Sequence, residues 1–369
     1  MLRFLTAGES HGQCLIAIVE GLPANLIIDE SEINLELSRR QKGYGRNTRM
    51  KIENDKVKIL SGVINGKSIG SPIALQIINK DWENWKEKWK QRSLPKLTIP
   101  RPGHADYPGM EKYNIDDARL ILERASARET AVRVAVGAIT RSLLKVFGIK
   151  IGSHVTSIGS ILATVPELPY EELWLLADKS ELHTADKTSE QKIKNEILNA
   201  SNNGDTLGGI FEINAINIPV GLGSHTHWDR RLDTKISAAL MSIPAIKGVE
   251  IGPAFNNAQL KGSEVHDEIF INENKNIYHK TNRSGGVEGG MSNGSPIVVR
   301  AAMKPIATIG TPLNSVDLST GTPANPLYQR SDVCAVPSAS IIGEAMLSWV
   351  LASALIEKYG GDSIEEMLR

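Results

Sequence analysis

The chain has 369 residues, of which 41% are hydrophobic and 23% charged, values typical of a globular protein with a sizeable core. Basic and acidic residues number 42 each, so the molecule as a whole has no electrostatic reason to bind nucleic acid or an anionic membrane. The two cysteines exclude a disulfide framework and a four-cysteine zinc site. We see no apolar run near the roughly 20 residues that span a bilayer, and no room for a signal peptide before a first glycine-rich motif. We therefore expect a cytoplasmic protein.

Hydrophobic periodicity predicts a mixture of strands and helices along the chain. In chain order we expect a strand at 15–19, a helix at 31–42, strands at 57–64 and 73–78, a long helix at 116–147, a helix at 188–200, a strand at 210–218, a helix at 229–241, a strand at 297–302 and a helix at 340–359. The strands at 57–64 and 73–78 are too close for a helical crossover, so antiparallel pairing is favoured. Because no repeat or low-complexity linker divides the chain, we predict one domain over residues 1–369 with mixed α and β layers.

Two loops each place a histidine beside glycine and near a carboxylate. The first is GESHG at 8–12, which contains Ser10 and His11, and the second is RPGHAD at 101–106, which contains His104 and Asp106. Small neighbours leave an imidazole accessible to a ligand, and imidazole exchanges protons near neutral pH. The loops therefore suggest two histidines that meet a substrate.

A basic segment follows at 38–52, where four arginines and two lysines occur without an acidic residue. A solvated basic face and a nucleic-acid patch both remain open at this point. Arginine forks match carboxylate and phosphate geometry, and the excess of arginine favours a small anion with several charges. Further arginines that could complete such a site are Arg101, Arg124, Arg128, Arg133 and Arg330.

Two other segments could contribute to a ligand site. At 123–130, glutamates and arginines stand at spacings that allow helical ion pairs, and Ala125, Ser126 and Ala127 leave a shallow surface beside them. The glycine-rich loop at 285–294 offers backbone donors, but it matches neither the P-loop nor the dinucleotide fingerprint.

Weaker signals receive a structural interpretation. His225, His227 and Asp229 lack an obvious further metal ligand, so we expect no metal site. Asp332, close to Arg330, could form a salt bridge only. Trp82, Trp85 and Trp89 recur at helical spacing, which predicts an aromatic face that packs against the body or a neighbouring subunit, and we assign them no chemistry.

Taken together, GESHG at 8, RRQKGYGR at 39, RPGHAD at 101, ERASARET at 123, GGVEGGMSNG at 285 and RSDVCAVP at 330 closely resemble the chorismate synthase family. The resemblance runs essentially end to end. It implies an α+β fold in the form of a single-domain β-α-β sandwich with antiparallel sheets, a homotetramer, and a requirement for reduced FMN. The implied activity is that of a lyase in the last step of the shikimate pathway to aromatic amino acids, the anti-1,4-elimination of phosphate from 5-enolpyruvylshikimate 3-phosphate to give chorismate.

The resemblance also implies roles for individual residues. His11 would act at the leaving phosphate, His104 near the flavin pyrimidine ring, and Asp332 would act with flavin N5 in taking up the substrate proton. Substrate-binding residues would be Ser10, Arg40, Arg46, Arg49 and Arg128, and Arg40 and Arg46 would also contact NADP. The remaining cofactor contacts would be Arg124, Ala125, Ser126, Pro244, Ala245, Gly289, Lys304, Pro305, Ile306, Ala307, Thr308 and Arg330. Ala125 and Ser331 depart from some family members, which have serine and histidine there.

Three further expectations follow. The chain has no large insertion, which favours an external flavin reductase over reduction of FMN by the protein itself. A non-catalytic protein that binds anions or nucleic acid would leave both histidine loops and Asp332 without a purpose. A metal-dependent phosphohydrolase would lose activity with a chelator, whereas a flavin enzyme would not.

Overall fold

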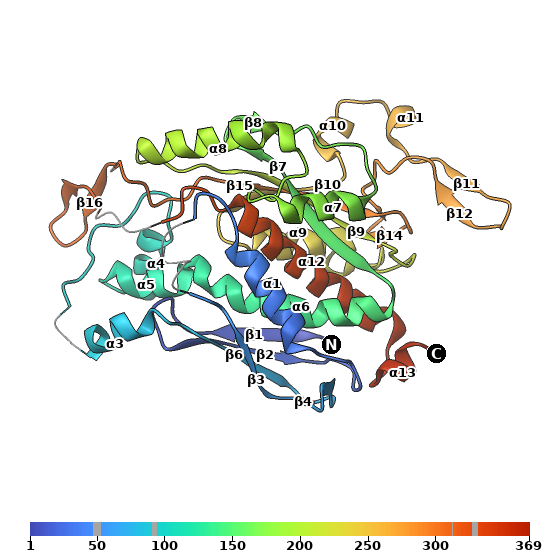
Figure 1. Cartoon of the computed structure of the whole chain (residues 1–369), viewed down its shortest axis with the longest axis horizontal. Helices are drawn as coiled ribbons and strands as arrows, with labels where there is room; N and C mark the ends of the chain where they lie inside the picture. Colours follow the sequence, from blue (N-terminus) through green and yellow to red (C-terminus); the bar gives the residue numbers. More distant parts are fainter. Residues whose placement is uncertain (47–52, 91–93, 312, 327–330) are drawn as a thin grey trace.

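Two antiparallel sheets enclose a central layer of helices (Figure 1), in a structural model computed from the sequence that describes residues 1–46, 53–90, 94–311, 313–326 and 331–369. The first sheet has the order β1 (Arg3–Ala7), β2 (Cys14–Glu20), β6 (Ile73–Ile78) and β3 (Val57–Ser61). The second has the order β10 (Ile246–Ile251), β15 (Ile297–Met303), β9 (Gly209–Ile216), β7 (Lys150–Ile158) and β8 (Ile161–Leu162). This arrangement confirms the predicted α+β sandwich.

The helices between the sheets are α1 (Glu30–Gln41), α6 (Thr130–Val146), α9 (Leu232–Met241) and α12 (Val336–Tyr359). Alternation along the strands supplies their packing surface, since Leu15, Ala17 and Val19 of β2 are fully buried while intervening residues are not. In β6, Ile73, Leu75 and Ile77 are buried in the same way, so the inner face of the first sheet is continuous across the pair.

The remaining elements surround this sandwich. They are β4 (Val63–Ile64), β5 (Lys67–Ser68), α3 (Trp82–Lys90), α4 (Asp106–Tyr113), α5 (Ala118–Ala125), the 3₁₀ turn η1 (Ala127–Glu129), α7 (Tyr170–Lys179), α8 (Lys187–Asn202), η2 (Trp228–Arg230), α10 (Ala254–Asn257), α11 (Gly262–Val265), β11 (Ile269–Ile271), β12 (Ile277–His279), β13 (Val287–Glu288), β14 (Met291–Ser292), β16 (Ser315–Asp317), β17 (Thr322–Ala324) and α13 (Ile364–Met367). In Figure 1, α3, α4 and α5 lie at one end of the molecule and the hairpin β11–β12 extends from the other.

The predicted strands at 15–19, 73–78, 210–218 and 297–302 correspond to β2, β6, β9 and β15. The predicted strand at 57–64 is interrupted at Gly62, whose φ of +84° ends β3 before β4 begins. The predicted helix at 229–241 begins as η2 and becomes α-helical only at Leu232. The sequence did not predict β1, β7, β10, α4 or α7.

The long helix predicted at 116–147 is wrong as a single element, because it divides into α5, η1 and α6. Ser126 adopts φ −63° and ψ 139°, which ends α5, and its side chain accepts a hydrogen bond from the Arg128 amide to begin η1. A serine in this role is an N-cap, and it redirects the chain within a segment whose composition suits a helix.

Helix α12 also changes an expectation about membranes. Its 24 residues include a stretch apolar enough to cross a bilayer by length and composition, contrary to our reading that no apolar run approaches that length. Of the most apolar window, 83% is buried inside the protein, where α12 packs between the sheets. In the described part of the chain it is the one helix with these properties, and its surroundings are those of a core helix.

A buried ionic cluster joins three of the central helices. Glu344 of α12 is 1% exposed, and its carboxylate accepts hydrogen bonds from Arg39 of α1 at 2.8 and 3.0 Å and from Arg141 of α6 at 2.5 Å. Ser153 of β7 donates a further hydrogen bond at 2.6 Å. Burial alone would raise the pKa of Glu344, but the two guanidinium groups hold it well below its usual range.

Helices α6 and α12 cross at Gly137. A Cβ atom on this residue would lie 2.3 Å from Cβ and 2.5 Å from Cα of Ala345, distances that no side chain can occupy. The two backbones therefore approach closely only because residue 137 has no side chain.

We predict that Glu344→Gln lowers the free energy of unfolding by about 3–5 kcal/mol at pH 7, because two buried guanidinium groups lose their counter-charge. The depressed pKa means that Glu344 stabilises the fold fully above its unfolded pKa of about 4.3 and progressively less as the pH falls towards the lower folded value. Urea denaturation should therefore show the largest difference at pH 7 and a smaller one below about pH 4. Glu357→Gln, on the exposed end of α12, serves as the control and should cost less than about 1 kcal/mol.

We predict that Gly137→Ala destabilises the protein by about 1–3 kcal/mol through overpacking, even though alanine has a higher helix propensity than glycine. Chemical denaturation measures the difference. Gly248→Ala is the matched control, since its Cβ would meet only Ala302 Cβ at an ordinary 3.6 Å. Equal stability of both variants would contradict the close crossing.

Candidate functional site

The loop at 8–12 joins β1 to β2 and carries Ser10 and His11. Gly8 has a φ of +113°, and a Cβ there would lie 2.4 Å from the Cys14 carbonyl, so the loop depends on glycine at its start. Nδ1 of His11 lies 2.7 Å from Oε1 of Glu123, and the other carboxylate oxygen accepts a hydrogen bond from the His11 amide at 2.7 Å. His11 is thus fixed by the end of α5.

The break at Ser126 brings this loop to the start of α6. Ser10 Oγ donates to Ser126 Oγ at 3.0 Å, and the Ser10 amide donates to the Glu123 carbonyl at 2.9 Å. Asn79, just after β6, donates to the carbonyls of Glu9 and Gly12 and accepts from Arg128 Nε at 2.8 Å. The histidine loop is therefore connected to an arginine.

Three arginines form a cluster beside this loop. Arg40 donates to Thr130 Oγ1 at 2.9 Å and to the Ala127 carbonyl at 3.0 Å. Arg128 donates to both oxygens of Asp55 at 2.7 and 2.8 Å. Arg46 lies 2.9 Å from Asp332. Each guanidinium is held by oxygen acceptors on one side.

Each of these arginines also has a buried nitrogen without a hydrogen-bond partner among the residues that the structure describes, namely Nη1 of Arg40, Nε of Arg46 and Nη2 of Arg128. The nearest carboxylates to two of them, Asp55 and Glu53, lie at 3.7 Å, beyond hydrogen-bond range. Buried donors of this kind are rare in native proteins and call for an explanation. An anionic ligand that accepts from all three would satisfy them.

The electrostatics of Arg40 agree with this interpretation. The pKa of Arg40 is lowered to about 10, chiefly by burial, with Asp55 and Asp332 acting in the opposite direction and Arg46 and Arg128 adding to the lowering. Arg40 still carries its charge at neutral pH. An anion placed among the three guanidinium groups would relieve their mutual repulsion.

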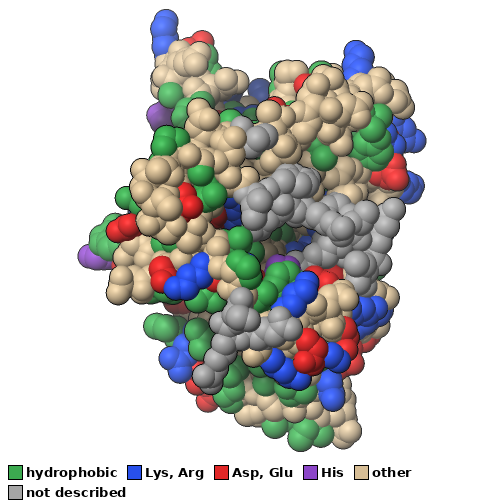
Figure 2. Space-filling view, turned by 90° about the vertical axis from the view of Figure 1, so that its left-hand side faces the viewer, with side chains coloured by type: hydrophobic (Ala, Val, Ile, Leu, Met, Phe, Trp, Pro, Cys, Tyr) green, Lys and Arg blue, Asp and Glu red, His purple; other side chains and the backbone are tan. Residues whose placement is uncertain are grey.

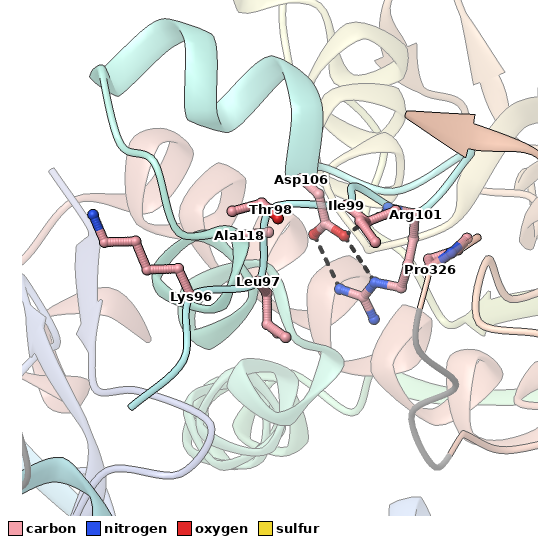
Figure 3. Close-up of a pocket in the computed structure, with 8 residues that line it drawn as sticks. All are labelled: Lys96, Leu97, Thr98, Ile99, Arg101, Asp106, Ala118 and Pro326. Carbon is pink, nitrogen blue, oxygen red and sulfur yellow. Dashed lines mark hydrogen bonds and ion pairs between the residues drawn. The ribbon is translucent and has the colours of Figure 1, made fainter. Parts of the chain in front are cut away.

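The second histidine loop precedes α4. His104 Nδ1 lies 2.5 Å from Asp106 Oδ1. Arg101 donates to the same carboxylate through Nε at 2.8 Å and Nη2 at 3.0 Å, as Figure 3 shows. Arg101 Nη2 also lies 2.9 Å from His104 Nδ1, but a nitrogen whose proton is donated to Asp106 cannot accept, so we assign that proton to the carboxylate contact. Burial would raise the pKa of Asp106, yet the bonds from His104 and Arg101 hold it well below its usual range.

The segment Lys304–Thr308, named as a flavin contact by resemblance, lies against this loop. Lys304 Nζ donates to the Gly103 carbonyl at 2.5 Å, and Arg101 Nη1 donates to Thr308 Oγ1 at 3.0 Å. The Thr308 carbonyl accepts from Ser331 Oγ at 2.6 Å, which brings the residue beside Asp332 to the same segment. In the described part of the chain the amides of Ile306, Ala307 and Thr308 donate to no acceptor.

The other predicted flavin contacts are distributed around α9. The backbone amide of Lys304 donates to the Ala245 carbonyl at 2.9 Å, so Pro244 and Ala245 adjoin the Lys304–Thr308 segment. Ser242 connects them to Arg124, because Arg133 bonds Ser242 Oγ at 2.8 Å and Glu129 at 2.8 Å, and Glu129 lies 3.7 Å from Arg124. Ala125 and Ser126 follow Arg124 directly.

Gly289 is the exception. It turns the chain between β13 and β14, and the next residue accepts from the first amide of α9, whereas Ala245 follows the last turn of that helix. Ten helical residues span about 15 Å, so Gly289 is not brought beside Ala245 within this chain. Arg49 and Arg330 lie outside the described residues.

A small pocket lies behind the second histidine loop (Figure 3). It encloses about 70 Å³ and is lined by Lys96, Leu97, Thr98, Ile99, Arg101, Asp106, Ala118 and Pro326. Ligand pockets typically enclose about 300–1,000 Å³, so this space is too small for a flavin. Another candidate is the hollow at the end of the molecule that carries α3, α4 and α5, inside which Figure 2 shows lysine or arginine and histidine surface.

The remaining sequence signals have clear outcomes in the structure. The predicted pairing of glutamate with arginine at helical spacing is present as Glu129 with Arg133, whereas Glu123 turns to His11. Asp332 forms a salt bridge with Arg46. His227 and Asp229 bond each other at 2.7 Å with both side chains more than half exposed, and among the described residues no three metal-ligating side chains gather.

Sequence reasoning missed several residues that hold the site together. Glu123, Asn79, Asp55 and Thr130 were assigned no role, because each reaches a partner distant in the sequence. Glu123 was visible only as part of a charged helix. In the second loop the sequence did indicate the carboxylate partner of the histidine, because Asp106 is only two residues from His104.

We predict that inorganic phosphate, at constant ionic strength, raises the melting temperature of the protein by filling the arginine cluster. Binding to the native state stabilises it by about 2.7 kcal/mol at a phosphate concentration 100 times the dissociation constant. Arg40→Lys keeps the charge but loses the fork, so its phosphate effect should be smaller. Arg230→Lys, on an exposed guanidinium paired with Glu357, is the control, and equal shifts in all three proteins would contradict the site.

Comparison with known proteins agrees with this arrangement. The family model described as chorismate synthase matches residues 2–356. A chorismate synthase of Aquifex aeolicus is 55% identical, covering 99% of this chain and 95% of the relative, and one of Geotalea uraniireducens is 53% identical, covering 100% and 97%. A crystal structure of chorismate synthase superposes with a TM-score of 0.81 at 47% identity, covering 100% of this chain and 95% of that chain. The chain therefore belongs to the chorismate synthase family.

Proposed function

We propose that this protein converts 5-enolpyruvylshikimate 3-phosphate to chorismate by anti-1,4-elimination of phosphate, with reduced FMN bound. The observation that carries the proposal, beyond family membership, is the arginine cluster with its three unpartnered buried nitrogens beside His11. The substrate has two carboxylates and a phosphate, which are the anions that guanidinium forks bind best. A neutral protein with a local arginine site suits such a small anion.

Phosphate departure requires charge neutralisation and an acid. Arg40, Arg46 and Arg128 would bind the anionic groups, and Ser10 would help to orient them. His11 would donate a proton or a hydrogen bond to the leaving phosphate oxygen as the carbon–oxygen bond breaks. Glu123 orients the His11 imidazole through Nδ1, so Nε2 is the nitrogen that would act on the leaving phosphate.

Proton removal from the substrate carbon is assigned to Asp332. Asp332, held by Arg46, would take up the proton as the carbon–hydrogen bond breaks, and the electron pair forms the new double bond. Ser331, the residue before Asp332, donates a hydrogen bond to the Thr308 carbonyl and so links Asp332 to the Lys304–Thr308 segment. The proposed proton acceptor, Asp332, is thus paired with Arg46, one of the arginines that would bind the anionic groups of the substrate.

The flavin residues fit a flat ring with polar edges. The free amides of Ile306, Ala307 and Thr308 would donate to such an edge, and His104, oriented by Asp106, would hold its protonation state. When bound, reduced FMN supplies an electron-rich ring beside the substrate, and the reaction consumes no net reducing equivalents. We further propose a homotetramer in the cytoplasm that receives reduced FMN from an external reductase, with NADPH as the source of electrons.

Anaerobic incubation with photoreduced FMN and 5-enolpyruvylshikimate 3-phosphate tests the proposal directly. We expect chorismate absorbance and phosphate release in equal amounts, and neither with oxidised FMN. A folded protein that forms no product with reduced FMN would refute the assignment.

We predict that His11→Ala and His104→Ala each lower turnover by up to about 10,000-fold, the range for loss of a general acid or base. Stopped-flow absorbance of chorismate measures the rates, and circular dichroism verifies folding. His227→Ala, an exposed histidine with its own carboxylate partner, is the control and should retain wild-type turnover. Wild-type rates in either of the first two variants would contradict the assigned roles.

A further inference from the structure

Helix α3 lies directly over the first histidine loop. Asn79 connects the loop to the helix. Its side chain donates to the carbonyls of Glu9 and Gly12 in the loop, and its backbone carbonyl accepts from the Trp82 amide at the start of α3 at 3.2 Å. Glu53 accepts from the amides of Lys80 and Asp81 and so fixes the approach to the helix. The position of α3 relative to His11 is therefore set by hydrogen bonds at its first turn.

Two tryptophans of α3 contact His11. The ring centroids of Trp85 and His11 are 4.4 Å apart with an interplanar angle of 33°. Trp89, one turn further, donates its indole N–H to the His11 carbonyl at 3.2 Å, and its ring centroid lies 5.8 Å from that of Trp85. The i,i+4 spacing puts both on one face of the helix. The aromatic face predicted from sequence thus holds both the ring and the backbone of His11.

Glu123 holds the same residue through other atoms. Its carboxylate is 4% exposed and binds the His11 amide and Nδ1, while its carbonyl accepts from the Ser10 amide. An ionised carboxylate only accepts, so Nδ1 carries a proton and Nε2 is the nitrogen that gains or loses one. Nε2 lies 3.9 Å from Asp81 Oδ2, on the residue that immediately precedes α3.

We propose that Glu123, Trp85 and Trp89 are positioning residues that clamp His11, so that one tautomer of the imidazole is presented to the ligand in one orientation. The clamp explains why a helix with a charged outer face keeps its tryptophans directed towards the loop: Lys86 pairs with Glu83, and Lys90 with Glu87, on exposed side chains. The proposal rests on the role assigned to His11 in the proposed function.

The first test is the tautomer of His11, which requires no substrate. In protein labelled with ¹⁵N at histidine, we expect the wild-type His11 signals to show a protonated Nδ1, with the signals assigned by their loss in His11→Gln. In Glu123→Gln the single amide oxygen cannot accept from both the His11 amide and Nδ1, so the population should shift towards a protonated Nε2. Glu212→Gln, a carboxylate 3.9 Å from His154, is the control and should leave the His11 signals unchanged. Unchanged signals in Glu123→Gln would overturn the tautomer assignment.

The second test compares tryptophans of the same helix. Trp85→Leu should lower kcat for chorismate formation by up to about 100-fold with little change in KM, since misplacement of a reacting group by about 1 Å costs this much. Trp85→Phe keeps a ring against the imidazole and should recover much of the rate. Trp82→Leu, whose ring does not contact His11, is the matched control and should behave as wild type.

Trp89→Phe removes only the indole donor to the His11 carbonyl, and it keeps the test valid if Trp85→Leu fails to fold. We expect it to lower kcat with little change in KM, because the His11 backbone loses one of its anchors. Equal losses in Trp82→Leu and Trp85→Leu, or wild-type kcat in Trp89→Phe, would show that α3 only packs. An absence of chorismate in wild type would refute the proposed function, while the tautomer measurement would still decide the clamp by Glu123.

Discussion

The buried carboxylate of Glu344 determines how the central helices are oriented. It binds Arg39 of α1 and Arg141 of α6, so one residue of α12 fixes the rotation of two neighbouring helices about their axes. Consecutive residues on a helix point about 100° apart. With Arg39 directed to Glu344, the adjacent Arg40 is directed to Ala127 of η1 and Thr130 at the start of α6. Adjacent residues of α1 thus serve the ionic core, through Arg39, and the ligand site, through Arg40.

The break at Ser126 is the second constraint, and it gives the site its shape. A continuous helix through this point would carry Arg128 and Thr130 along the axis of α5. Instead the chain turns, and Ser126 contacts Ser10 while Arg128 reaches Asp55 and Asn79. Groups from β1–β2, β6, α1 and α6 meet at this turn, which explains why the functional motifs are scattered along the sequence.

The sequence predicted strands β2 and β6 well, because Leu15, Ala17 and Val19 in the first and Ile73, Leu75 and Ile77 in the second alternate with more exposed residues. It did not predict the break at Ser126, since Ala125, Ser126 and Ala127 are compatible with a helix and only contacts with Ser10 decide otherwise. Strand β7 was also missed, because it is buried nearly throughout and shows little alternation.

For the site, local signals identified the groups that can exchange protons or bind anions, but not their partners. Glycines around His11 and the absence of acids near Arg40 are visible in a few consecutive residues. The contacts of Glu123 with His11 and of Asp55 with Arg128 join residues 112 and 73 positions apart. No local pattern encodes such distances, so the resemblance to a family supplied the roles and the structure supplied the connections.

The place of α12 in the chain has a consequence for folding during synthesis. Helix α12 (Val336–Tyr359), which packs between the two sheets, follows every strand of both sheets in the chain. During synthesis all of these strands therefore emerge from the ribosome before α12 does. The apolar surfaces that α12 covers stay unburied until that helix is made, so the core between the sheets can be completed only after the last strand has been synthesised.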